Sequence, residues 1–101
     1  MDLPVVALPS LESLREHVRS VLCEHDRLDP NQSELRMAIV CRGGSACGLF
    51  FQVIGIHRQK GYALWAGDEH RLLFYDATGQ RYAETVLSES PDPLALQRDA
   101  A

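Results

Sequence analysis

A chain of 101 residues is long enough for one domain with a hydrophobic core, and 46% hydrophobic with 24% charged residues is ordinary for a globular protein. The formal net charge of −4 argues against a nucleic acid partner, because phosphate binding needs clustered lysine and arginine. No basic segment follows Met1 and no apolar run approaches the roughly 20 residues that span a bilayer, so we expect a cytoplasmic protein without a membrane partner.

The N-terminal part predicts one helix. Residues 1–9 carry an apolar run between Pro4 and Pro9, which interrupt a continuous strand ladder, so we expect an extended lead-in or a short edge strand. Ser10 is a suitable N-cap, and apolar residues then recur at helical spacing as far as about Asp26. The residues of this stripe are Leu11, Leu14, Val18, Val21 and Leu22. We therefore predict a helix over about 10–26.

The apolar period changes to two between Leu35 and Leu87, and glycine-marked turns separate the apolar segments. After Ser88 the prolines cannot continue a sheet, so residues 88–101 are expected to form a flexible C-terminal tail. The predicted fold class is α+β, with one N-terminal helix packed on a five-strand antiparallel β-meander in a single domain over 10–87. The expected strands are 35–42, 47–57, 62–66, 71–76 and 80–87.

A three-residue turn at Gly43-Gly44-Ser45 would place Arg42 opposite Ala46 and sort the first hairpin onto two faces. The first face then pairs Cys41 with Cys47, Ile39 with Leu49, Met37 with Phe51, and Leu35 with Val53. All of these residues are apolar, so we expect the helix to cover the first face. The second face mixes charge with bulk, and holds Arg36, Ala38, Val40, Arg42, Phe50, Gln52 and Ile54.

The later turns predict further pairings. Gln59-Lys60-Gly61 is typical of a tight turn that places Arg58 opposite Tyr62 and Ile56 opposite Leu64. In that register Trp65 lies across Gly55 as a core residue of the first face, rather than as a ligand-stacking residue. The connection 76–80 similarly predicts that Phe74 pairs with Tyr82, whereas the turn 67–70 leaves the facing of the last two strands open.

The cysteines are interpreted as reduced structural thiols. Cys41 and Cys47 are expected among apolar side chains, which disfavour the thiolate that nucleophilic chemistry requires. The alternative is redox or nucleophilic use of one of them, with His57 as the nearest base. No metal or cofactor is expected, because the available ligands show no usual zinc spacing. Those ligands are Cys23, His25, Cys41, Cys47, His57 and His70.

Two polar segments receive structural interpretations. Asp68-Glu69-His70 could pair a carboxylate with a general base, but acidic residues beside Gly67 are typical of a solvated hairpin tip. Residues 43–48 are rich in glycine, but they lack the Lys-Ser/Thr pair and the following helix of a phosphate loop.

One helix covers only one face of a sheet, so the second face is predicted to bind a partner. The alternative cover is the N-terminal segment with Val5, Val6 and Leu8, but its prolines and short length argue against complete coverage. Its apolar centre and polar rim are typical of partner surfaces, and the candidate interface consists of Phe50, Ile54, Ile56, Tyr62, Leu64, Arg42 and Arg58. We predict a small non-enzymatic binding or oligomerisation module, as a homodimer or with a protein partner. The alternatives are a small thiol-dependent enzyme or redox protein that uses Cys41 or Cys47, and a pocket between helix and sheet for an unidentified small molecule.

Overall fold

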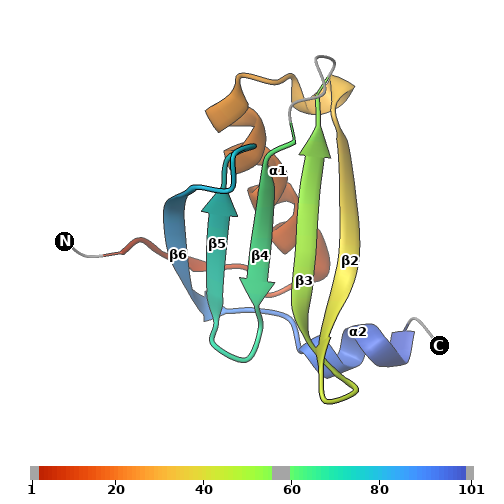
Figure 1. Ribbon diagram of the computed structural model, residues 1–101. Helices are drawn as coiled ribbons and strands as arrows, with labels where there is room; N and C mark the ends of the chain where they lie inside the picture. Colours follow the sequence, from red (N-terminus) through yellow and green to blue (C-terminus); the bar gives the residue numbers. More distant parts are fainter. Residues whose placement is uncertain (1–2, 56–59, 100–101) are drawn as a thin grey trace.

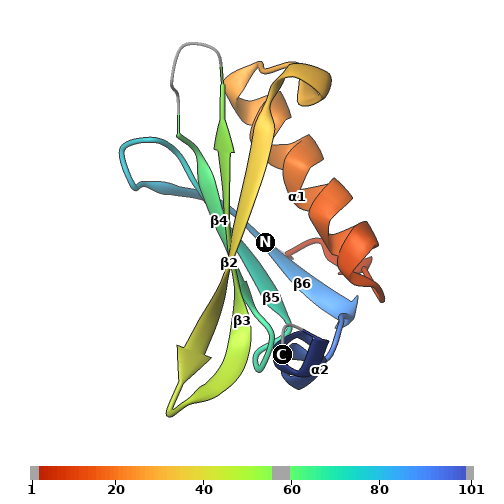
Figure 2. The same cartoon turned by 90° about the vertical axis from the view of Figure 1, so that its right-hand side faces the viewer.

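The computed structural model describes residues 3–55 and 60–99, which form one sheet with helices on one side (Figures 1 and 2). In chain order the elements are β1 (Val5–Ala7), α1 (Leu11–Asp26), the 3-10 turn η1 (Pro30–Gln32), β2 (Glu34–Arg42), β3 (Ser45–Ile54), β4 (Tyr62–Ala66), β5 (Arg71–Tyr75), β6 (Arg81–Glu89) and α2 (Pro93–Asp99). No helix among the described residues is long and apolar enough to cross a membrane.

The α+β class is confirmed, but the sheet differs from the predicted five-strand antiparallel meander. The described residues form a mixed sheet of six strands in the order β1-β6-β5-β4-β3-β2. The additional strand, β1, runs parallel to β6, and the other neighbouring strands are antiparallel. The Pro4 carbonyl accepts a hydrogen bond from Val86 N, and Leu8 N donates to the Glu89 carbonyl. The N-terminal segment is therefore a short edge strand, the second of the two expected alternatives.

The predicted N-terminal helix is confirmed, and its start has a local cause. The Ser10 hydroxyl accepts from Ser13 N at 3.1 Å, and Ser13 Oγ accepts from Ser10 N at the same distance. This reciprocal capping satisfies backbone donors that the first helical turn leaves free. At the other end Arg27 adopts a left-handed conformation with φ of 56°, which terminates α1.

The core lies between α1 and the first face of the sheet. Leu14, Val18 and Leu22 of the predicted stripe are fully buried, whereas Leu11 and Val21 lie half-buried at its margin. The sheet residues of the same core are Leu35, Leu49, Phe51, Val53, Ala63, Trp65, Leu72, Phe74 and Leu87. No helix or strand of the described residues lies over the second face, as Figure 2 shows.

The first hairpin combines confirmed and wrong pairings. Leu35 pairs with Val53, Met37 with Phe51 and Ile39 with Leu49 as predicted, but Cys41 pairs with Ala46 rather than Cys47. The turn contains only Gly43 and Gly44, whose φ angles of 60° and 83° suit a two-residue hairpin turn. A bulge after Val40 then takes up the extra residue on β3. The predicted alignment of the two thiols is therefore wrong.

The second predicted register is also wrong, although its faces are right. Trp65 pairs with Leu49 and not with Gly55, and Tyr62 pairs with Gln52. Gly48 is the glycine that allows β3 and β4 to approach, because a Cβ there would overlap the Trp65 carbonyl oxygen. The predicted partners Ile56 and Arg58 lie outside the described residues. Trp65 is nevertheless a core residue, 1% exposed.

The structure shows which residues of β5 and β6 lie on each face, which the ambiguous turn 67–70 did not allow us to predict. Leu72 and Phe74 point to the first face, where they are buried. Phe74 pairs with Ala83 rather than Tyr82, because a bulge follows Phe74.

The segment predicted as a flexible tail contains a helix, because residues 93–99 form α2. At the start of this helix, Asp92 Oδ1 accepts a hydrogen bond from Leu94 N at 3.0 Å. The helix contacts β3.

Candidate binding surface

The second face is a continuous surface over β2 to β6. Strand pairing aligns its residues in rows, because alternate residues of paired strands share a face. One row is Arg36-Gln52-Tyr62-Tyr75-Arg81, the next is Ala38-Phe50-Leu64-Leu73-Glu84, and the third is Val40-Gly48-Ala66-Arg71-Val86. The pair Glu34-Ile54 extends this surface at one end. These rows and this pair make up the second face in the structure, without Arg42, which pairs with Ser45 beside the turn.

Aromatic rings form the centre of the second face. Tyr62 and Tyr75 are stacked, with ring centroids 4.8 Å apart and planes 9° apart. Phe50 lies on the other side of Tyr62, at 5.6 Å and a tilt of 33°. All three rings are half-buried, because each is shielded by its neighbour but by no covering element of the described chain. This row therefore leaves stackable aromatic area partly exposed.

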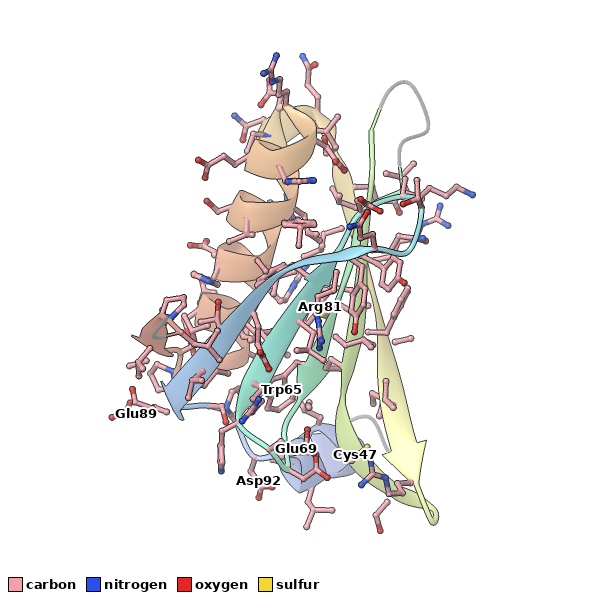
Figure 3. The ribbon with its side chains drawn as sticks, turned by 60° about the vertical axis from the view of Figure 1, so that its left-hand side comes forward. Cys47, Trp65, Glu69, Arg81, Glu89 and Asp92 are labelled. Carbon is pink, nitrogen blue, oxygen red and sulfur yellow. The ribbon has the colours of Figure 1, made fainter. Side chains whose placement is uncertain are left out.

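Charged side chains surround this centre. Arg71 donates to Glu84 Oε1 at 2.8 Å, and Arg36 lies 3.4 Å from Glu34. Arg81 forms no ion pair with any described residue. Figure 3 shows Arg81 midway along the sheet, away from the α2 end where Cys47, Trp65 and Glu69 lie. An apolar centre with a polar rim of both signs is the composition of a protein interface.

Only some of the predicted interface residues lie together on the second face. Phe50, Ile54, Tyr62 and Leu64 share the second face, whereas Ile56 and Arg58 lie outside the described residues. Arg42 lies at the turn end of β2, where its guanidinium is 3.3 Å from Asp68. Leu73 and Tyr75 also belong to this face. Residues 72–75 are all apolar, so the alternation that identifies a buried face carries no signal there.

The cysteines do not form a common site. Cys41 is exposed, Cys47 is half-buried with its thiol 3.5 Å from the Val40 carbonyl, and Cys23 is buried in α1. His57, the base expected in the thiol-enzyme alternative, lies outside the described residues. Burial raises the pKa of the Cys23 thiol, although a hydrogen bond with Ser33 opposes the shift. Within the described chain, no three His, Cys, Asp or Glu side chains are grouped so as to hold a metal ion.

These environments predict the native thiol reactivity. In native protein at pH 8, a thiol reagent should label Cys41 fastest and Cys47 more slowly, and it should reach Cys23 only after unfolding, because reaction requires an accessible thiolate. Quantitative labelling followed by peptide mass spectrometry measures this order. Labelling of Cys47 faster than free cysteine would instead support the thiol-dependent alternative. Replacing Cys41 and Cys47 together with alanine should leave the protein folded.

The remaining polar segments have structural roles. Asp68, Glu69 and His70 are exposed at a turn, where Glu69 N donates to the Ala66 carbonyl and His70 Nδ1 lies 3.1 Å from Ser90 Oγ.

A depression of about 720 Å³ lies on the outer side of α1, and not between the helix and the sheet, where a small-molecule pocket was considered. Its lining comes from α1 and the turn after it, with Glu12, Arg15, Glu16 and Arg19 among its residues.

Comparison of this chain with protein-family models, with curated proteins and with solved structures found no match. The second face is therefore the feature of the described residues that bears most directly on function.

Proposed function

We propose that this protein is a small non-enzymatic association module that forms a homodimer through the second face. The observation that carries the proposal is the aromatic row Phe50, Tyr62 and Tyr75, which lies on three adjacent strands without a covering element in the described chain. Apolar surfaces of this kind mark partner sites in soluble proteins. A chain of 101 residues also gains stability from an additional buried interface.

A second copy suits this surface because the second face is self-complementary. A two-fold axis parallel to the sheet, midway between the two copies, packs one aromatic row on the other, as in two sheets of a sandwich. The rim offers both charges, with Arg36, Arg71 and Arg81 beside Glu34 and Glu84. Arginines of one copy can then meet carboxylates of the other, whereas a rim of one sign would repel its own copy.

Substitution of Phe50 with glutamate tests this proposal. A carboxylate at the centre of an apolar interface must be desolvated, so we expect association to weaken by at least about 100-fold. Sedimentation equilibrium over a wide concentration range measures the average mass, and circular dichroism verifies the fold. Leu94→Glu, on the exposed side of α2 at 48% exposure, is the matched control and should leave the mass unchanged. A Phe50→Glu variant with the wild-type mass would contradict the proposal.

A further inference from the structure

The two edges of the sheet differ sharply. β1 is three residues long and lies between Pro4 and Pro9, so it offers little backbone to another strand. β2 is nine residues long, contains neither proline nor glycine, and has no charged residue between Arg36 and Arg42. Natural sheets usually block edges of this length with charge or proline, because an open edge pairs with other chains. The β2 edge lacks that protection at its centre.

The hydrogen-bonding groups at this edge can be assigned. Val53 N donates to the Gly61 carbonyl and Gly67 N donates to the Cys47 carbonyl, so odd-numbered residues of β3 bond toward β4. In antiparallel sheets, alternate residues direct their N–H and C=O groups to opposite sides. Even-numbered residues such as Phe50 therefore bond to β2, where Phe50 pairs with Ala38. It follows that Met37 and Ile39 direct their backbone groups away from the sheet.

The side chains at the same positions favour a partner strand. Met37 and Ile39 lie on the first face but are 39% and 40% exposed, whereas their β3 partners Phe51 and Leu49 are buried. Figure 1 shows α1 behind the middle of the sheet, and α1 packs chiefly on β3 and β4 rather than on β2. The β2 edge therefore combines outward-directed backbone groups with exposed apolar side chains.

We propose that β2 pairs with β2 of a second copy, antiparallel, about a two-fold axis that is perpendicular to the sheet and passes midway between the two Ala38 residues. Met37 then lies opposite Ile39 of the second copy and Ala38 opposite its own counterpart. At both ends Glu34 lies opposite Arg42 of the other copy. Paired over the full strand, the odd-numbered residues exchange about eight backbone hydrogen bonds.

The charges at the strand ends select this register. In a pairing of two β2 edges, odd-numbered residues must lie opposite odd-numbered residues, because these direct their backbone groups outward. The nearest alternative registers therefore move each facing residue by two positions along the strand. One such shift places Arg36 opposite Arg42, which repels. The other places Glu34 opposite Val40, which leaves its carboxylate without a facing cation. The register centred on Ala38 pairs the whole strand and brings opposite charges together.

Existing ion pairs do not prevent this arrangement. Glu34 is 3.4 Å from Arg36 and Arg42 is 3.3 Å from Asp68, but the four side chains are 43% to 77% exposed. Exposed pairs of this kind exchange at little cost. The axis of the edge pairing is perpendicular to the sheet, whereas the axis proposed for the second face runs parallel to the sheet and outside it. We place the two axes so that they intersect above Ala38, in which case the two interfaces together close a tetramer.

Because the edge pairing rests on different residues from the proposed function, a pair of variants separates them. Ile39→Lys places a charge on the β2 edge and Phe50→Glu places one on the second face; Val5→Lys on the β1 edge is the control. Sedimentation equilibrium should give a tetramer for wild type and Val5→Lys, a dimer for each of the other single variants and a monomer for the double variant. Unchanged mass on Ile39→Lys would overturn the edge pairing alone. If Phe50→Glu has no effect and Ile39→Lys gives a monomer, only the second-face proposal fails.

Crosslinking tests the register directly. In a Cys41→Ser, Cys47→Ser background, Ala38→Cys places two thiols on the two-fold axis, in a pair whose Cα atoms are about 4.5 Å apart, within disulfide range. Copper-phenanthroline oxidation should crosslink most of this variant at micromolar concentration. Val40→Cys, whose counterparts are staggered along the strands, should crosslink at least tenfold more slowly. Equal or faster crosslinking at position 40 would overturn the register.

Charge exchange gives a second readout of the same register. Glu34→Arg and Arg42→Glu should each weaken the edge dimer in the Phe50→Glu background, because each places like charges opposite. The variant that carries both substitutions restores the pair and should recover the starting affinity. Failure of the combined variant to recover would overturn the pairing of Glu34 with Arg42 of the second copy.

Discussion

Replacing Phe51 with alanine should lower the free energy of unfolding by about 3–5 kcal/mol, as for other buried aromatic residues. Phe51 is fully buried on β3, between Met37 and Ala63 in the ladder and beneath α1. Truncation would remove its apolar burial and leave a cavity under the helix. Domains of this size are stable by about 5–15 kcal/mol, so a large part of the total would be lost.

Phe50→Ala is the matched control for this change, because Phe50 is the next residue of β3 and is half-buried on the second face. Guanidinium denaturation measures the free energy of unfolding of both variants. A low micromolar protein concentration keeps the contribution of association to that free energy small. The Phe50 change should cost clearly less than the Phe51 change. Equal costs would show that the two faces of β3 are not differently buried.

Gly48→Ala should destabilise the protein by at least about 3 kcal/mol, more than typical overpacking, because the added methyl group has no space. A Cβ at position 48 would overlap the Trp65 carbonyl oxygen and lie 3.4 Å from Gly67 N. These are backbone atoms of the neighbouring chain segment, so no side-chain rotation relieves the contact. β3 and β4 would have to separate at the end of their ladder, where Gly48 pairs with Ala66.

Gly44→Ala distinguishes crowding from backbone freedom. Gly44 has φ of 83° and nothing within 4 Å of a Cβ, so alanine there should cost only the left-handed strain of about 1–2 kcal/mol. Denaturation followed by Trp65 fluorescence measures both glycine variants. A Gly48→Ala variant no less stable than Gly44→Ala would mean that β3 and β4 lie farther apart than the structure places them.

Local patterns were sufficient for α1, for the strands from β2 to β6 and for most of their faces, but not for α2, which was predicted as a flexible tail. Ser10 and the apolar stripe predicted α1, and the period of two predicted the strands from β2 to β6. Trp65 was assigned a wrong partner but the right face, because Gly55 and Leu49 differ by an even number of residues along one strand. For the same reason Phe50, Ile54, Tyr62 and Leu64 were correctly grouped on one face.

Contacts between distant residues decided the rest. Only the tertiary structure brings Val5 beside Val86, Gly48 against Trp65, and α2 onto β3. It also assigns Leu73 and Tyr75 to the second face, where an unbroken apolar run had no alternation to read. The physical reason is that burial repeats with the period of each element and so is visible in a short segment. Strand register and edge pairing depend instead on which distant backbones fit together, and the sequence of one segment does not contain that fit.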